Sequence, residues 1–221
     1  MSKVDRSVLQ RDGVRAAVRA AGNAHLLMSD AEVARSLAGI MAGHAADSPV
    51  WVFGYGSLIW NPLMEYAERQ TAYVHGYHRG FYVWSKVNRG SPETPGLVLG
   101  LDRGGCCHGV AYRLHSASLR EDLELLWRRE MIGGTYMPRW VNAELGDRHV
   151  RAIAFTVNRS KPGYTGRMSD EQIIEVAAHA VGHYGSCADY LTQTARSLEA
   201  QGLPDRRLSR LARMLNKELK T

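Results

Sequence analysis

The sequence has few cysteines and no long apolar run. Three of its 221 residues are cysteines, and two of them, Cys106 and Cys107, are adjacent. They therefore do not provide the pairs of a disulfide framework. No run of about 20 apolar residues is present, which argues against a membrane span, and the N-terminus lacks the apolar core of a secretory signal. We expect a cytoplasmic protein, in a reducing compartment, with no membrane partner.

The sequence also lacks the common signatures of cofactor and nucleophile sites. Gly54 and Gly56 are not followed by the third glycine of a dinucleotide fingerprint, and neither a Walker motif nor G-x-S-x-G occurs. The nearest approach to a metal site is His75 and His78, with Cys106-Cys107-His108 downstream. No C-x-x-C pair is present, and adjacent cysteines rarely bind one tetrahedral ion. We therefore expect no cofactor and no metal.

Positive charge is in excess, with a formal net charge of +6. Such a charge suits a nucleic acid or an anionic small molecule. Much of it lies near the C-terminus, however, where a solvated helix face explains it equally well. Five tryptophans offer either a stacking platform for bases or core packing, and all lie within apolar segments: Trp51, Trp60, Trp84, Trp127 and Trp140. No recognisable nucleic-acid-binding module accompanies the charge, so we expect no nucleic-acid partner.

The chain divides into an N-terminal helical extension, residues 1–49, and a main domain, residues 50–221. Two helices are predicted in the extension, at 5–21 and 30–43, from their apolar spacing and flanking breakers. No chemistry is visible there, so we expect the extension to pack on the main domain or to mediate self-association. The sequence does not indicate an oligomeric state.

The main domain begins with strands and ends with helices. Prolines and glycines separate the predicted strands, which are 50–54, 71–74, 81–84, 97–101, 109–114, 139–145 and 150–157. One helix interrupts them, at 119–131, where Ser118 with Glu121 matches a capping box. Further helices are predicted at 170–183, 187–200 and 205–220. This segregation favours an α+β fold, and several short strands in one domain favour a small barrel or a strongly curved sheet.

The stretch 51–60, WVFGYGSLIW, joins a short β-prone run to a glycine-containing loop. Glycine allows a sharp turn and a close approach of a ligand to the main chain. Free backbone N–H groups after such a strand can form a small anion-binding concavity. The alternative is an ordinary tight turn after a core strand.

Glu130 is an acid on the apolar stripe of its helix. It follows Leu123 by seven residues and Leu126 by four, so all three lie on one face. The other charged residues of the helix fall largely off this stripe and are expected to reach water: Glu121, Asp122, Glu124, Arg128 and Arg129. Burial and the negative end of the helix dipole should both raise the pKa of Glu130. It therefore suits a proton shuttle, unless it forms a buried ion pair with Arg79 or Arg139.

Six segments occur in the order and spacing of a known family. They are VFGYGSLIWNP at 52–62, HRGF at 78–81, TPGLVLGL at 94–101, GVAYRL at 109–114, RREMIGGTY at 128–136 and DYL at 189–191. Over about residues 50 to 200 the chain resembles the ChaC-like γ-glutamylcyclotransferases, in particular their bacterial branch.

The resemblance implies the γ-glutamylcyclotransferase-like fold, a small mixed β-barrel with flanking helices. It also implies cleavage of glutathione into 5-oxoproline and cysteinylglycine, without metal or cofactor. In the family, the Y-G-S-L loop holds the γ-glutamyl group and a glutamate moves protons. The matching positions are Tyr55, Gly56, Ser57 and Leu58 for the loop and Glu130 for the acid. Tyr136, Tyr190 and Arg79 match further family residues, and Arg79 has either a structural or a substrate-binding role.

The chain departs from the family in two places. Residues 1–49 have no counterpart in the family core, and Cys187 stands where the resemblance predicts asparagine. Two rival functions remain: a cyclotransferase for other γ-glutamyl amino acids or amines, and a non-catalytic ligand-binding protein of the same fold. An acid in the core argues against the second, because a non-catalytic protein gains little from it.

Overall fold

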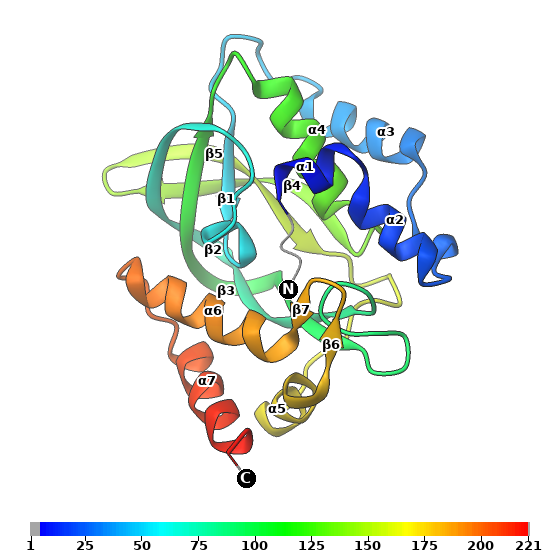
Figure 1. Cartoon of the computed structure of the whole chain (residues 1–221). Coiled ribbons are helices and arrows are strands. Elements are labelled where there is room, and N and C mark those ends of the chain that lie inside the picture. Colours follow the sequence, from blue (N-terminus) through cyan, green and yellow to red (C-terminus); the bar gives the residue numbers. More distant parts are fainter. Residues whose placement is uncertain (1–4, 221) are drawn as a thin grey trace.

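A closed β-barrel forms the centre of the protein in the computed structural model, which describes residues 5–220 (Figure 1). Its strands are β1 (Trp51–Gly54), β2 (Tyr66–Ser85), β3 (Gly96–Leu114), β4 (Tyr136–Leu145) and β5 (Arg148–Val157). They are arranged in the order β1-β3-β2-β4-β5, and parallel pairing of β5 with β1 closes the barrel. The expected α+β fold with a small mixed barrel is confirmed.

Two of the barrel strands are much longer than predicted. The predicted strands 71–74 and 81–84 are both parts of β2, and 97–101 and 109–114 are both parts of β3. β2 and β3 pair along nearly their whole length, with shifts of register at three places. The glycines that suggested breaks lie inside these strands because a glycine can also form a bulge within a ladder.

The N-terminal segment consists of short helices packed beside the barrel. They are α1 (Arg6–Gln10), α2 (Gly13–Ala20), the 3₁₀ helix η1 (Ala24–Leu26) and α3 (Asp30–Met41). The single helix predicted at 5–21 is wrong, because Asp12 has a left-handed backbone (φ 54°) that separates α1 from α2. Positions 1–4 of the predicted extension, and position 221 of the predicted main domain, lie outside the described residues.

Helix α4 (Leu119–Glu130) packs on the barrel through its apolar stripe. Leu123, Leu126 and Trp127 are buried, and the Trp127 ring meets the Phe155 ring of β5 edge-on at 5.1 Å. Burial of each such side chain contributes about 1.5–3 kcal/mol. This contact fixes the direction in which the last residue of α4, Glu130, points.

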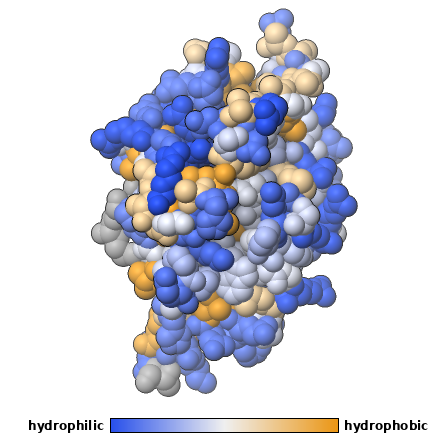
Figure 2. Space-filling view, turned by 90° about the vertical axis from the view of Figure 1, so that its right-hand side faces the viewer, coloured by the Kyte–Doolittle hydropathy of each residue, from blue (hydrophilic) through white to orange (hydrophobic). Residues whose placement is uncertain are grey.

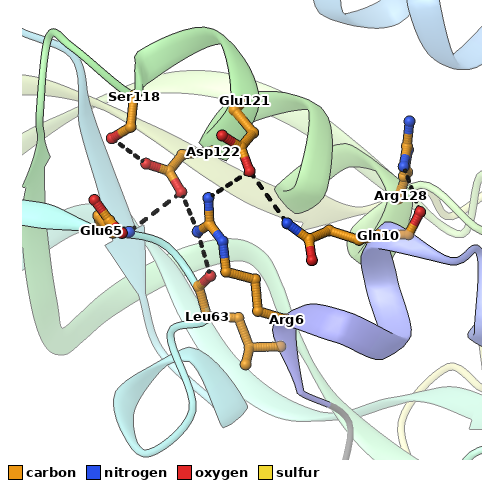
Figure 3. Close-up of polar contacts among 8 residues, drawn as sticks. All are labelled: Arg6, Gln10, Leu63, Glu65, Ser118, Glu121, Asp122 and Arg128. Atoms are coloured by element: carbon orange, nitrogen blue, oxygen red, sulfur yellow. Dashed lines mark hydrogen bonds and ion pairs between the residues drawn. The ribbon is translucent and has the colours of Figure 1, made fainter.

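The start of α4 differs from its prediction. The Ser118 side chain makes no capping hydrogen bond to the helix and instead donates to the Asp122 carboxylate at 2.6 Å. Asp122 was expected to reach water, but its side chain is fully buried. It forms an ion pair with Arg6 of α1 at 2.6 Å and accepts a hydrogen bond from the Glu65 amide (Figure 3). A buried carboxylate needs such partners, and α1 supplies one of them.

Three helices and a short hairpin complete the chain. They are α5 (Asp170–His179), β6 (Val181–Gly182), β7 (Gly185–Ser186), α6 (Cys187–Ala200) and α7 (Arg206–Glu218). The helix predicted at 170–183 is shorter because the hairpin begins at Val181. No helix within residues 5–220 combines the length and apolar character needed to cross a membrane. The face shown in Figure 2 is largely hydrophilic, with its apolar residues in small separate patches.

Candidate active site

The loop after β1 is held by β3, the strand that pairs with β1. It continues into the 3₁₀ helix η2 (Ser57–Ile59), and the Leu58 carbonyl accepts a hydrogen bond from the Tyr112 hydroxyl at 2.9 Å. A Cβ atom on Gly56 would lie 3.3 Å from the Tyr190 hydroxyl, so glycine permits this close approach. The N–H groups at the start of η2 have no acceptor in their own turn. They are therefore donors available to a ligand.

Glu130 lies in the same cavity as this loop. Its side chain is 14% exposed, and burial raises its pKa above the usual value, although Arg129 acts in the opposite direction. The direction of this pKa shift agrees with the sequence prediction. The predicted ion-pair partners were wrong: Arg129 forms the pair, not Arg79 or Arg139.

Arg129 connects the acid to the loop. Its Nε lies 3.0 Å from the Glu130 Oε1, and its Nη2 donates to the Ser57 hydroxyl at 2.7 Å. A further hydrogen bond runs from Nη1 to the Asn61 carbonyl. The side chain is only 11% exposed, so the expectation that Arg129 reaches water was wrong. One guanidinium thus sets the position of Glu130 relative to Ser57.

Four tyrosines line the cavity, Tyr55, Tyr136, Tyr184 and Tyr190. The hydroxyl groups of the three predicted ones, Tyr55, Tyr136 and Tyr190, differ in what they can still offer to a ligand. Tyr55 donates to the Phe155 carbonyl at 2.6 Å, and Tyr136 donates to the Leu99 carbonyl at 2.7 Å. The Tyr190 hydroxyl instead accepts from the Leu99 amide at 3.2 Å. Of these three, only Tyr190 therefore keeps its own hydroxyl proton for a ligand. Burial raises the pKa of Tyr190 to about 12, so that proton is retained at neutral pH.

The cavity has a volume of about 320 Å³, which is within the range of small-molecule sites. The predicted residues that line it are Tyr55, Gly56, Ser57, Leu58, Glu130, Tyr136 and Tyr190. Four cationic side chains also line it, Lys86, Arg89, Arg129 and Lys161. Glu130 is the one acid among the described residues of the lining. The cavity thus carries a net positive charge.

Arg79 does not line this cavity. Its Nε forms an ion pair with Asp205 at 2.8 Å, and its Nη1 donates to the Tyr55 carbonyl at 2.8 Å. Asp205 caps the N-terminus of α7. Of the two roles that the sequence left open for Arg79, the geometry favours the structural one, in which it holds the start of the loop.

Cys187 also lies outside the cavity lining. Its side chain is fully buried and exchanges hydrogen bonds with the backbone of Leu97, at 3.3 Å to the amide and 3.2 Å to the carbonyl. Cysteine in place of the expected asparagine therefore changes a buried contact with β3, not the surface of the cavity.

Sequence reasoning missed two parts of the cavity. One is an apolar wall from the N-terminal segment, made by Val14, Val18 and Leu26. The other is the segment after β2, which contains Asn88 and Arg89. The apolar residues of α2 and η1 gave no signal of a ligand site. Arg89 lies in a stretch rich in proline and glycine, and the sequence pattern of this stretch indicated an ordinary loop.

The two histidines of the candidate metal site, His75 and His78, make other polar contacts. The His78 Nδ1 donates to the Gly104 carbonyl, and its Nε2 shares a hydrogen bond with the Tyr82 hydroxyl, each at 2.8 Å. His75 lies 3.1 Å from a Glu144 carboxylate oxygen. No group of three metal-ligating side chains occurs in the part of the chain that the structure describes.

Residues 50–218 match the protein-family model described as "ChaC-like protein". The glutathione-specific γ-glutamylcyclotransferase of Escherichia coli K12 is 41% identical over 181 residues, which are 81% of this chain and 78% of that protein. Glutathione-specific γ-glutamylcyclotransferase 1 of Mus musculus is 33% identical over 165 residues, 72% of this chain and 74% of the other.

A solved structure has the same fold. The crystal structure of a selenomethionine-labelled γ-glutamyl cyclotransferase specific to glutathione, from yeast, superimposes with a TM-score of 0.72. The aligned region covers 77% of this chain and 97% of that one, at 23% sequence identity. The family match begins at residue 50, so the wall formed by Val14, Val18 and Leu26 lies outside it.

Proposed function

The chain belongs to the family of ChaC-like proteins, and from this premise we propose that it cleaves glutathione into 5-oxoproline and cysteinylglycine. Relatives at 41% and 33% identity bear the name of glutathione-specific γ-glutamylcyclotransferases. The observation that carries the proposal is the position of Glu130: a carboxylate with a raised pKa in the same cavity as the Tyr55–Leu58 loop.

The reaction is an intramolecular exchange of one C–N bond for another. The α-amine of the glutamyl group attacks its own γ-carbonyl carbon and closes a five-membered ring. The bond from that carbon to the cysteine nitrogen then breaks, and cysteinylglycine leaves. No water is consumed. Since the nucleophile is tethered, the site has to hold the folded conformer and move protons.

Glu130 serves as the proton carrier in this proposal. The α-amine begins as an ammonium group, which cannot attack until a base removes a proton. A carboxylate with a raised pKa takes that proton more readily than an ordinary glutamate does. Glu130 then donates it to the departing cysteine nitrogen. The ring nitrogen loses a second proton when it becomes the lactam amide, and the released amine takes up that proton as an ammonium group. Glu130 is therefore again a carboxylate for the next cycle.

The loop is proposed to stabilise the negative charge that develops on the γ-carbonyl oxygen. Main-chain N–H groups of Gly56, Ser57 and Leu58 are fixed donors, and fixed donors are more effective than water because they need no reorganisation. The hydroxyl of Tyr190 is a further donor beside Gly56. Ser57 is not required as a covalent nucleophile, because the substrate supplies its own.

The remaining assignments follow from the same proposal. Residues 50–221 form the catalytic domain, and residues 1–49 form a helical extension that contributes to its cavity. The small-molecule partner is glutathione, and the chain acts in the cytoplasm without a nucleic-acid or membrane partner. No cofactor enters the reaction as written.

The test is an assay of the purified chain with reduced glutathione, without added metal, in which both products are quantified. We expect 5-oxoproline and cysteinylglycine in equal amounts. Turnover of γ-glutamyl-alanine in preference to glutathione would favour a broader cyclotransferase. Absence of product from a folded chain with every γ-glutamyl substrate would overturn the proposal and favour a ligand-binding protein.

A further inference from the structure

Arg89 is a rigidly held cation in the wall of the cavity. Its backbone amide donates to the Ser85 hydroxyl at 2.9 Å, and its Nη1 donates to the Tyr184 carbonyl at 2.9 Å. Its guanidinium carbon lies 5.5 Å from the centre of the Tyr190 ring. Three contacts from different parts of the chain thus fix both the backbone and the side chain of this arginine.

The short β6–β7 hairpin supports the segment that carries Arg89. A Cβ atom on Gly182 would lie 2.5 Å from the Arg89 amide nitrogen, so the hairpin backbone rests directly on this segment. The amides of His183 and Tyr184 donate to the carbonyls of Val87 and Asn88, at 2.7 and 3.1 Å. The guanidinium is therefore positioned before any ligand arrives, which lowers the entropic cost of binding.

The charge of Arg89 is not neutralised by an ion pair. No acidic side chain in residues 5–220 pairs with it, although Asp189 acts on it through space. Burial lowers its pKa, the direction expected for a cation with little counter-charge. In contrast, Arg129 is paired with Glu130. Arg89 is thus the half-buried cation in the lining that still lacks a carboxylate.

Tyr190 separates Arg89 from the loop. The hydroxyl end of Tyr190 lies beside Gly56, whereas Arg89 lies against its ring. In the proposed function the loop holds the glutamyl end of glutathione. The Tyr190 side chain thus lies between Arg89 and the loop, which leaves Arg89 for the other end of the tripeptide.

Resting on the proposed function, we propose that Arg89 binds the C-terminal glycine carboxylate of glutathione and thereby selects this tripeptide over γ-glutamyl compounds without that carboxylate. A guanidinium matches a carboxylate with two parallel N–H donors, which gives geometric selectivity as well as affinity. The exposed lysines of the lining, Lys86 and Lys161, add positive charge that attracts the same anion.

The test compares glutathione with its C-terminal amide, γ-glutamyl-cysteinyl-glycinamide, which loses one charge and little else. For the unaltered chain we expect kcat/KM to be about 10–100-fold lower with the amide. In Arg89→Met the two substrates should become nearly equal, because glutathione falls to the level of the amide. Arg89→Lys keeps the positive charge but loses the two parallel N–H donors of the guanidinium. It should therefore discriminate less between glutathione and its amide than the unaltered chain does. Arg120→Met removes an exposed arginine on α4 (93% exposed) and should leave the ratio unchanged.

Two results would overturn this assignment. One is an unchanged substrate ratio in Arg89→Met and Arg89→Lys. The other is an equal loss with both substrates, which would place Arg89 at the glutamyl end or in a purely structural role. Melting temperatures show whether each variant is folded. If Arg89→Met does not fold, the ratio of the two substrates is compared between Arg89→Lys and the unaltered chain.

A binding measurement separates this inference from the proposed function. In calorimetric titrations of Glu130→Gln, glutathione should bind about 10–100-fold more tightly than the amide, and the difference should vanish when Arg89→Met is added. If the unaltered chain releases no 5-oxoproline but this pattern of binding holds, the proposed reaction fails while the role of Arg89 stands. Equal binding of the two ligands, or binding of neither, would overturn the role of Arg89.

Discussion

The Nε of Arg129 lies 3.0 Å from the carboxylate of its neighbour in the sequence, Glu130. Successive residues of a helix normally point about 100° apart, so the side chains of two sequence neighbours do not usually meet. Here the pair lies at the end of the helix, and partners outside the helix hold the two side chains together. Ser57 supplies one such partner, through its hydrogen bond with Arg129. The pair therefore links the candidate base to the candidate oxyanion loop.

Replacing Glu130 with glutamine should abolish nearly all turnover while the chain still folds. Glutamine keeps the shape of the side chain but neither accepts nor returns the proton, and general acid–base catalysis contributes about 10²–10⁴-fold to rate. The measurement is 5-oxoproline release, with circular dichroism to check the fold. Glu124→Gln, at a half-exposed position of the same helix, is the matched control and should stay active. Retained turnover in Glu130→Gln, with contaminating enzyme excluded, would show that Glu130 is not the proton carrier.

The pH profile should depend on Arg129. A base must be deprotonated to act, so kcat/KM falls as the pH drops through the pKa of Glu130. Burial raises that pKa, and the positive charge of Arg129 lowers it. Arg129→Met removes the lowering influence, so the acidic limb of kcat/KM should move to higher pH, whatever the loss of rate. The control Arg120→Met should leave the limb in place, and a limb that does not move in Arg129→Met would contradict the coupling.

Replacing Ser57 with alanine should reduce activity less than replacing Glu130. The main-chain donors of the loop remain, and the change removes the acceptor of one hydrogen bond from Arg129. Hydrogen bonds to charged groups contribute about 1.5–3 kcal/mol, so we expect a loss of about 10–100-fold in kcat/KM. Complete inactivity, in a folded Ser57→Ala, would indicate that the hydroxyl itself takes part in the chemistry.

The tyrosines Tyr136 and Tyr190 offer a matched pair of variants. Each phenylalanine substitution leaves one buried backbone group of Leu99 without its partner, the carbonyl in Tyr136→Phe and the amide in Tyr190→Phe. Both should lose about 1–3 kcal/mol of unfolding free energy. Only Tyr190→Phe should also lower kcat/KM strongly, since only this hydroxyl keeps a proton for the substrate. Equal kinetic effects of the two substitutions would argue against the assignment.

Replacing Arg6 with alanine should loosen the N-terminal helices. It leaves the fully buried Asp122 without its cationic partner. Removing one partner of a fully buried pair costs about 3–5 kcal/mol, and the partial exposure of Arg6 reduces this to about 1–3 kcal/mol. Urea unfolding measures the loss, and limited proteolysis reports cleavage within 5–28.

The kinetic consequence of Arg6→Ala is a higher KM for glutathione, because Val14 and Val18 of the same segment line the cavity. Arg11→Ala removes an arginine whose side chain donates to Ser7 of the same segment, and it serves as the control. Unchanged stability, KM and proteolysis in Arg6→Ala would show that the extension does not depend on this contact.

The local pattern of the sequence determined the class of fold and the place of the acid. Apolar spacing with period 3.6 placed Leu123, Leu126 and Glu130 on one face of a helix, and the structure buries that face. The glycine loop was identified from a short β-prone run that leads directly into Gly54 and Gly56. These features depend on residues a few positions apart, so they can be deduced without knowing what packs against them.

Only the tertiary structure decided which charged groups meet. Arg6 reaches Asp122 across 116 positions of sequence, and Arg129 reaches Ser57 across 72. The β6–β7 hairpin fixes Arg89 beside Tyr190, and the apolar face of α2 becomes a wall of the cavity. A charged side chain takes the partner that folding brings within hydrogen-bond distance, and burial then makes that pairing necessary. Periodicity predicts which face of a helix is covered, but the residues that cover it are selected by the packing of the whole chain.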